Sequence, residues 1–335
     1  MRLVHGINLD EEVEPLFSGP VSDRVLLLDA DGIAYSVAST VKKLDTAYRN
    51  FIKAVMVEMF CVGAERALVY ITPKGNRKAH REHYPTFKPY QGNRKNKSKP
   101  PLLEPLRTYL SGNPEGVPDN IEIIAPMDVE ADDLVITAAH QYEELGVTHS
   151  PDKDLHMTPW PKWNADLGVV EMLSDGTGFG YVVEKFTEGG SAKAYGHGRK
   201  FFWYQMLAGD TADNVRGIDK LNGKNCGHVA ALEYVNRFDD ETELAEAILW
   251  EYFKINQDAL AEAECLWLRR YDDDNAARYF LEVVQDSTLR MYIKALHKRH
   301  QRILDEKINE SADLALQAES ACEAGWVVPD LPPTN

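Results

Sequence analysis

Acidic residues gather in four short clusters within the first two thirds of this 335-residue chain. Three of the clusters follow apolar runs that are typical of buried strands, and the fourth lies in a polar turn. Ligands of an open parallel sheet bind beyond the carboxyl ends of its strands, so the first three clusters are expected to converge there. The clusters are Asp29 and Asp31; Glu130, Asp132 and Asp133; Asp152 and Asp154; Asp210 and Asp213.

Nine carboxylates in one cleft would repel one another, and several would take up protons unless cations were bound. Mg²⁺ and Mn²⁺ are suitable partners, because these hard ions prefer carboxylate and water oxygens. A single cluster is more simply explained by helix capping or by a favourable interaction with a helix dipole. All four together, at the ends of predicted elements, predict a metal-dependent site.

The elements that would position these acids alternate between strands and helices. Strands are predicted at 24–29, 66–72, 120–126 and 147–150, and helices within 37–59, near 101–111 and over 129–146, ending at Gly146. This alternation predicts an α/β fold, with a mostly parallel central sheet flanked by helices.

The chain divides into three predicted parts. The α/β core spans 20–236 and ends in two short helices around the turn GIDKLNGK. A helical C-terminal region follows at 237–322, and the Pro-containing end, 323–335, is expected to be a disordered tail. The Trp- and Gly-rich stretch 159–200 shows no pattern that predicts its elements.

Charge is distributed unevenly along the chain. Residues 74–99 contain nine Lys or Arg and one acid, so this segment carries +8 within a chain of net charge −16. An acidic body with one basic segment is consistent with a local nucleic-acid footprint, because phosphate backbones attract Lys and Arg. Long unstructured insertions in compact domains are commonly functional, although a solvated basic loop is the alternative for the segment taken alone.

Composition excludes several other classes of protein. Hydrophobic residues make up 44% and charged residues 27%, which is ordinary for a globular protein. No apolar run approaches the roughly 20 residues of a membrane span. The acidic beginning lacks a signal-peptide core, so we expect a cytoplasmic protein. The four cysteines form no CxxC pair, which argues against zinc and disulfide frameworks.

Five segments occur in an order that resembles the 5′-nuclease superfamily, which includes flap endonucleases, polymerase I 5′-nuclease domains and bacteriophage 5′-exonucleases. They are LLLDADGIAYSVAS, HREHYPTFKPYQGNRK, VEADDLV, SPDKDL and LAGDTADNVRGI. The resemblance covers about 24–236 and is nearest in style to the phage enzymes. It implies a metal-dependent 5′-to-3′ exonuclease or flap endonuclease acting on DNA with a 5′ end or flap, with an RNA–DNA hybrid as a further candidate.

The resemblance also implies roles for the acids. Asp29, Glu130 and Asp132 would hold one Mg²⁺ or Mn²⁺, and Asp152, Asp154 and Asp210 a second, about 4 Å away. Asp133 and Asp213 would support them, and Asp31 would be an additional ligand. The two ions would activate a water and stabilise the leaving oxygen.

In the same resemblance, the basic segment corresponds to a helical arch at about 74–112. Lys88 would lie beside the scissile phosphate, while Arg81 and Arg94 would hold neighbouring phosphates. Arg77, Lys95 and Lys97 would add phosphate contacts. Three interleaved aromatics would either stack on bases or pack within the arch: Tyr84, Phe87 and Tyr90.

The region 204–236 resembles a helix–three-turn–helix, which grips duplex DNA through main-chain N–H groups, with a monovalent cation as a further candidate ligand. Gly217, Lys220 and Lys224 would contact the duplex. The family usually has glycines where this chain has Lys220 and Asn222, which predicts a weaker or differently shaped grip.

Two alternatives remain beside the nuclease. A haloacid-dehalogenase-like phosphatase would use Asp29 as nucleophile and Asp31 as general acid, but it leaves the other clusters and the basic segment unexplained. The other is a nucleic-acid-binding relative with weak catalysis. It is suggested by a missing ligand: the resemblance places an Asp at Thr72 or Pro73, and neither residue is acidic. The first metal is therefore expected to bind weakly.

Overall fold

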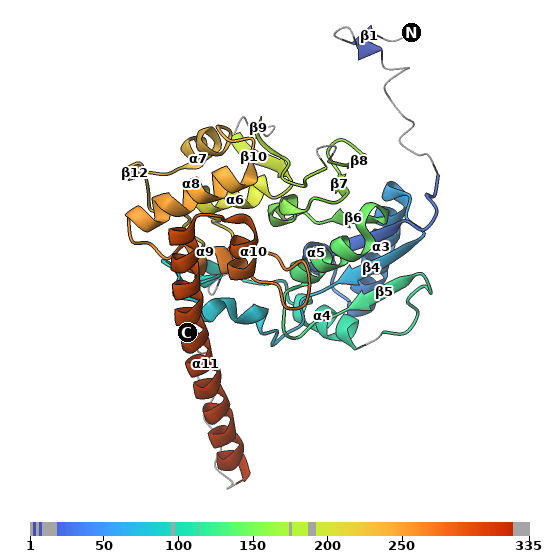
Figure 1. The fold of residues 1–335 in the computed structure, drawn as a ribbon. Coiled ribbons are helices and arrows are strands. Elements are labelled where there is room, and N and C mark those ends of the chain that lie inside the picture. Colours follow the sequence, from blue (N-terminus) through green and yellow to red (C-terminus); the bar gives the residue numbers. More distant parts are fainter. Residues whose placement is uncertain are drawn as a thin grey trace.

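The computed structural model describes residues 3–4, 7–8, 19–94, 98–112, 114–173, 176–186 and 192–323. At its centre lies a six-stranded sheet in the order β5-β4-β3-β6-β7-β8 (Figure 1). Neighbouring strands are parallel except β7 and β8. The strands are β3 (Val25–Asp29), β4 (Arg66–Tyr70), β5 (Ile121–Ile124), β6 (Gly146–His149), β7 (Lys162–Asn164) and β8 (Val169–Glu171). The predicted α/β class is confirmed.

Both faces of β3 are buried, because its side chains alternate between two hydrophobic clusters. Leu26 and Leu28 pack with α2 (Asp31–Thr40), α3 (Leu44–Val62) and α4 (Leu103–Ser111). Leu27 belongs to the opposite cluster, which includes α5 (Ala131–Tyr142). A parallel strand covered on both faces requires a continuous apolar run, which LLL provides. The packing fixes the carboxyl end of β3, where the first acids lie.

Two predicted helices differ from the observed ones. The stretch 37–59 is divided between α2 and α3 at 41–43. The helix that was predicted to end at Gly146 ends at Tyr142, and Gly146 opens β6 instead. A Cβ at Gly146 would lie 2.8 Å from Leu27 Cδ1. Glycine is therefore required by the close approach of β6 to β3 and not by a helix cap.

The stretch 159–200, for which no elements were predicted, is built mainly of strands. Besides β7 and β8, it contains the antiparallel hairpin of β9 (Tyr181–Phe186) and β10 (Ala192–His197). Val182 of β9 packs in the same cluster as α6 (Lys200–Ala208). The hairpin thus covers the start of the helix that leads into the acidic turn at Asp210.

The chain after residue 200 is largely helical, as predicted. After α6 come β11 (Lys220–Leu221), β12 (Lys224–Asn225), α7 (His228–Val235), α8 (Glu241–Lys254), α9 (Ala259–Leu266), α10 (Ala276–Val283) and α11 (Ser287–Glu323). Trp203 of α6 stacks on Phe280 of α10, with ring centroids 5.3 Å apart, and one hydrophobic cluster holds both. The predicted boundary at 236–237 therefore does not separate two cores.

Helix α11 packs against the body of the molecule through its first turns, up to the buried His300. Leu289 and Ile293 lie in the shared cluster, and the helix then projects from the body of the molecule (Figure 1). The predicted tail beyond Glu323 lies outside the described residues. At the other end of the chain, β1 (Leu3–Val4) and β2 (Ile7–Asn8) form a short antiparallel pair. No helix in the described part of the chain is long and apolar enough to cross a membrane.

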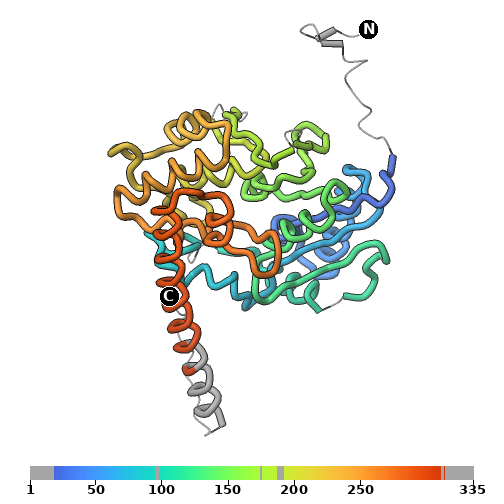
Figure 2. Tube along the Cα trace, viewed as in Figure 1, coloured from blue at the N-terminus to red at the C-terminus, as the bar shows by residue number. Residues whose placement is uncertain are grey.

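The basic segment was predicted as a helical arch, and before α4 its described part is mostly non-helical. It contains two short 3₁₀ turns, η1 (Lys78–His83) and η2 (Gly92–Arg94). The segment passes from the sheet to α11 (Figure 2), where the Tyr84 ring meets the His300 ring edge-on at 5.4 Å. The segment is a loop that is anchored on the C-terminal helices. No local sequence pattern predicts this anchoring.

Candidate metal centre and nucleic-acid interface

Acidic side chains lie beyond the carboxyl ends of the parallel strands, as the sequence predicted. Asp29 is the last residue of β3, and Glu130 is the N-cap of α5, after β5. Asp152 follows β6 and begins the 3₁₀ turn η4 (Lys153–Met157). The Ser150 hydroxyl donates to Asp29 Oδ2 over 2.7 Å, and the Asp152 N–H donates to the Ser150 hydroxyl. Ser150 thus links the acids of two neighbouring strands.

Three buried acids form the tightest cluster. Asp154, Asp210 and Asp213 each offer a carboxylate oxygen, and these oxygens all lie within 4.8 Å of one another. The backbones of Asp210 and Val215 exchange two hydrogen bonds, which close the turn after α6 and aim both turn acids at Asp154. Asp210 Oδ2 is buried without a hydrogen-bond partner among the described residues. An all-oxygen set with an unpartnered carboxylate oxygen fits a hard divalent cation.

The electrostatics of this cluster also call for a cation. Burial, and then the charges of Asp152 and Asp210, raise the pKa of Asp154 well above its usual value. Burial raises the pKa of Asp213 to about 6. Within the protein, Lys153 Nζ lies 2.8 Å from Asp210 Oδ1, and Arg94 is ion-paired with Asp213. These two cations compensate part of the charge that a metal ion would neutralise.

Asp152 lies beside this cluster. Its Oδ1 accepts from the Asp154 N–H over 3.1 Å and so caps η4. Burial raises the pKa of the Asp152 carboxyl, and the Asp210 charge raises it further. Asp154 itself is held by the buried amide of Gln205, which donates to Asp154 Oδ1 over 2.5 Å. Gln205 is a partner that the sequence analysis missed, and its position on α6 beside the acidic turn is the signal that could have indicated it.

The acids expected at the first metal are more dispersed. Burial, followed by the charge of Asp31, raises the pKa of Asp29 to about 7. Burial, followed by the charge of Asp133, raises the pKa of Asp132 well above its usual value. Among the described residues, the set of Asp29, Glu130 and Asp132 does not meet the 4.8 Å spacing that the other trio meets.

Asp31 and Thr72 form hydrogen bonds with each other and with neighbouring residues. Asp31 Oδ1 accepts from Arg107, 2.8 Å away, and from the Thr72 N–H over 3.2 Å. The Thr72 hydroxyl accepts from the Ala131 N–H over 3.1 Å, which caps the start of α5. Thr72, where the sequence analysis noted a missing acid, therefore serves as a helix cap. Asp31 helps to hold β4 and α4 beside the site.

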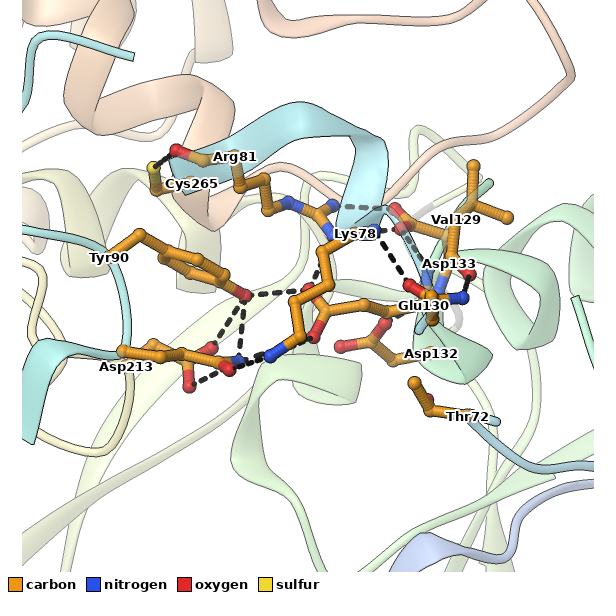
Figure 3. Close-up of polar contacts among 12 residues, drawn as sticks. Thr72, Lys78, Arg81, Tyr90, Val129, Glu130, Asp132, Asp133, Asp213 and Cys265 are labelled. Carbon is orange, nitrogen blue, oxygen red and sulfur yellow. Dashed lines mark hydrogen bonds and ion pairs between the residues drawn. The ribbon is translucent and has the colours of Figure 1, made fainter. Parts of the chain in front are cut away.

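Arg81 requires a correction, because it does not face solvent as a phosphate-binding residue would. Its guanidinium is 2% exposed and contacts Asp133 through two N–H···O bonds of 2.8 and 2.6 Å. It also donates to Glu130 Oε2 and to the carbonyls of Glu264 and Trp267. Figure 3 shows the Arg81 guanidinium facing Glu130 and Asp133. Arg81 ties the basic segment to α5 and to the C-terminal region.

Asp133 is likewise occupied within the protein and acts in support of Glu130. Its side chain is fully buried, and it accepts from Arg81 and from the N–H groups of Glu130 and Arg269. Both oxygens are engaged, so Asp133 orients Glu130 and does not offer itself to a metal. The Glu130–Asp133 pair forms a capping box at the start of α5, in which each side chain accepts from the other's backbone.

Of the two roles expected for Tyr90, stacking on a base is excluded, because its side chain is buried. Its hydroxyl lies 2.7 Å from Glu130 Oε2 and 3.1 Å from Asp213 Oδ2. Gln91 Nε2 donates to Glu130 Oε1 and Asp213 Oδ1, over 3.2 Å each. Tyr90 and Gln91 thus bridge the two groups of acids, a role that the sequence analysis missed for Gln91.

Lys78, another cation of the basic segment, lies beside this bridge. Its amine contacts Gln91 Oε1 and lies 3.9 Å from Glu130 Oε1 (Figure 3). Lys78, Ala79 and His80 have φ values of 49°, 53° and 59°, a left-handed run that is costly for residues other than glycine. Such strain persists where the surroundings impose it, commonly at functional sites. Lys78 is a site residue that the sequence analysis counted as basic without giving it a role.

The remaining basic and aromatic candidates lie further out. Lys88 is exposed, and its amine contacts no acid among the described residues. Phe87 is exposed, whereas Tyr84 is half-buried against His300. Arg77 forms an exposed ion pair of 2.9 Å with Asp128. Lys95 and Lys97 lie outside the described residues.

The turn between α6 and α7 contains the predicted duplex contacts. Asn222 adopts a left-handed conformation with φ of 51°, which Asn tolerates where the family has glycine. Gly217 has a φ of 69°, and a Cβ there would lie 2.4 Å from Gly209 N, so only glycine fits. Lys224 is exposed, while Lys220 donates to Asn225 across the β11–β12 hairpin.

No protein-family model matches the sequence, and no curated protein matches it. Solved structures of bacteriophage T5 nucleases match most of the chain at low sequence identity. A flap endonuclease variant of bacteriophage T5, in a pseudo-enzyme–product complex with DNA and metal ions, shares 14% identity at a TM-score of 0.47, over 83% of this chain and 99% of that one. The T5 5′-exonuclease with bound zinc ions shares 15% sequence identity at a TM-score of 0.44. The match covers 84% of this chain and 98% of that one.

Proposed function

We propose that this chain is a metal-dependent nuclease that hydrolyses phosphodiester bonds of DNA, as a 5′-to-3′ exonuclease or structure-specific flap endonuclease. The observation that carries the proposal is the buried trio of Asp154, Asp210 and Asp213, with its unpartnered Asp210 oxygen. A second group of acids lies at the same sheet edge and is joined to the trio by Tyr90 and Gln91. A basic loop passes over both groups, which favours a polyanionic substrate.

Two sets of residues would hold divalent ions, Mg²⁺ or Mn²⁺. Asp152, Asp154 and Asp210, supported by Asp213, would hold one, and Asp29, Glu130 and Asp132 the other. Bound there, such ions would generate a nucleophilic hydroxide from water and neutralise charge on the reacting phosphate. The second set has Thr72 beside it instead of an acid, and Thr72 is committed to capping α5. This set is therefore the weaker of the two.

The protein's own cations would bind and orient the substrate. Lys78 reaches the space between the two groups of acids, so its amine is placed to stabilise the negative charge that grows on the scissile phosphate. Exposed Lys88 and Phe87 lie on the outer part of the same segment, where they would contact the strand that leaves the site. Lys224 would contact the backbone of the duplex.

The phosphatase alternative is not supported by the contacts of Asp31. A phosphatase of that class needs Asp31 as a general acid facing the substrate. Here its Oδ1 is held by Arg107 and by the Thr72 N–H. The binding-only relative remains the second candidate, and the observation in its favour is Thr72 at the ligand position.

The proposal is tested with purified protein and 5′-labelled substrates: a flap, a blunt duplex, a single strand and an RNA–DNA hybrid. We expect cleavage in Mg²⁺ or Mn²⁺, none in chelator, and the highest rate on substrates with a free 5′ strand. Retained binding without cleavage in both metals would overturn the nuclease proposal in favour of the binding-only relative. Hydrolysis of small phosphate esters with intact oligonucleotides would instead indicate a phosphatase.

A further inference from the structure

A buried carboxylate of the C-terminal region contacts two separate segments of the proposed nucleic-acid interface. Glu262, on α9, is 1% exposed. Its Oε1 accepts from the Phe87 N–H over 2.9 Å, and its Oε2 accepts from the N–H groups of Arg216 and Gly217 over 3.1 and 3.2 Å. Three backbone donors from two distant stretches of chain therefore meet on one side chain.

Two neighbouring side chains hold the α6–α7 turn without reaching the basic segment. Glu251 Oε2 accepts from the Asn222 N–H over 3.1 Å. Gln257 accepts from the Asp219 N–H over 2.8 Å and donates to the Gly217 carbonyl over 2.8 Å. These bonds do not involve the basic segment. A substitution at Glu251 or Gln257 therefore loosens the turn without breaking its connection to Phe87.

A buried carboxylate in a nucleic-acid-binding protein needs an explanation. Its charge opposes the approach of phosphates, and its desolvation is unfavourable. Glu262 forms no ion pair among the described residues, so its charge is compensated by the three N–H groups. It is suited to hold main-chain segments in place, since an ionised carboxylate accepts several strong hydrogen bonds at once.

We propose that Glu262 is a positioning residue that couples the basic segment to the α6–α7 turn, and so fixes the strand-holding part of the site relative to the duplex-holding part. This inference rests on the proposed function. Near the acids, direct hydrogen bonds also join the basic segment to the turn after α6. The Gln91 N–H donates to the Asp213 carbonyl, and Asn93 Nδ2 donates to the Thr211 carbonyl. Glu262 supplies the link on the side of the C-terminal helices, which gives that region a part in the reaction.

The test compares Glu262→Gln with Gln257→Ala. Glutamine keeps the shape of glutamate but offers one acceptor oxygen, so one of the two links is lost while the core stays filled. We expect Glu262→Gln to lower kcat on a flap substrate by about ten- to a hundredfold, since small misplacements of reacting groups have effects of this size. KM should change little. Gln257→Ala should instead raise KM while kcat stays near that of the unaltered protein.

Amide hydrogen exchange gives a readout that does not depend on cleavage. Exchange over 84–90 should accelerate relative to the unaltered protein in Glu262→Gln and remain unchanged in Gln257→Ala, at melting temperatures matched within a few degrees. Equal exchange and equal kinetics in the two variants would overturn the coupling role, and so would tighter DNA binding by Glu262→Gln with unchanged kcat. If the unaltered protein cleaves nothing, the proposed function fails, while the exchange comparison still decides whether Glu262 couples the two segments.

Discussion

Arg81 and Asp133 form a buried, two-pronged ion pair 52 residues apart in the chain, with N···O distances of 2.8 and 2.6 Å. The pair joins the base of the basic segment to the first turn of α5, where Glu130 and Asp132 lie. It therefore holds the cations of the segment over the acids of the sheet. Arg81 was expected to contact DNA, but in this fold it is a structural anchor.

The anchor can be tested by equilibrium unfolding in denaturant. Arg81→Met leaves Asp133 buried without its charge partner, and breaking such a pair costs about 3–5 kcal/mol. The matched control is Arg77→Met, which removes the exposed pair with Asp128 and should cost less than about 1 kcal/mol. Equal stability of the two variants, with DNA binding weakened by Arg81→Met, would show that Arg81 is a phosphate contact after all.

Lys78 and Lys88 are predicted to act differently on the reaction. Lys78→Ala removes the amine beside Glu130, and we expect single-turnover cleavage to slow by about a hundredfold, the size typical of a lost charge-stabilising donor. Lys88→Ala should weaken binding and reduce its salt dependence, with a smaller effect on the rate. Single-turnover rates and fluorescence anisotropy across a salt series separate the two effects. The reverse ranking of the rates would return the catalytic role to Lys88.

Thr72→Asp should strengthen the weaker metal set. Aspartate adds a carboxylate beside Asp31 and can still accept from the Ala131 N–H, so the cap of α5 is kept. We expect the Mg²⁺ concentration for half-maximal cleavage to fall in a metal titration. Thr72→Val, which removes the oxygen without adding charge, is the matched control and should not lower it. A titration curve unchanged or shifted upward by Thr72→Asp would contradict this account of the first site.

Stability without metal should depend on pH through Asp29. The pKa of its carboxyl is raised from 3.8 to about 7, chiefly by burial. Between about pH 4 and 7 the folded protein keeps a proton on Asp29 that the unfolded chain has lost, so stability falls as pH rises through this window. One such group contributes up to about 1.4 kcal/mol per pH unit. In chelator, Asp29→Asn should make the fall in melting temperature between pH 4 and 7 shallower than in the unaltered protein. An equally steep pH dependence in this variant would contradict the raised pKa.

Local patterns were sufficient to predict β3, β4, β5 and β6 and the acids that lie beyond their carboxyl ends. The run VLLLD predicted β3, and the acid at its end lies at the sheet edge because a parallel strand fixes its own carboxyl end. The two short helices around the α6–α7 turn were likewise indicated by apolar spacing and by the glycines between them. Asn222 in the left-handed region follows from the tolerance of Asn for that conformation.

The partners of buried polar residues could not be predicted in the same way. Arg81 is satisfied by carbonyls of Glu264 and Trp267, more than 180 residues later in the chain, and local sequence shows no sign of them. Tyr90 is likewise buried by a fold in which Glu130 and Asp213 converge on its hydroxyl. Basic and aromatic residues in a loop favour nucleic-acid contact when only composition is considered. Tertiary packing decides which of these residues are buried and hold the loop in place, as Arg81 and Tyr90 do, and which remain exposed, as Phe87 does.

The central claim is that Asp154, Asp210 and Asp213 hold a metal that is required for cleavage. The most direct measurement is the rate of cleavage of a 5′-labelled flap in Mg²⁺ and Mn²⁺ by the unaltered protein and by Asp210→Asn, with DNA affinity measured in parallel in chelator. Asp166→Asn, which alters an exposed acid paired with Lys185, is the control. We predict that Asp210→Asn abolishes cleavage and binds DNA as tightly as the unaltered protein or more so, while Asp166→Asn cleaves normally. Near-normal cleavage by Asp210→Asn would contradict the account.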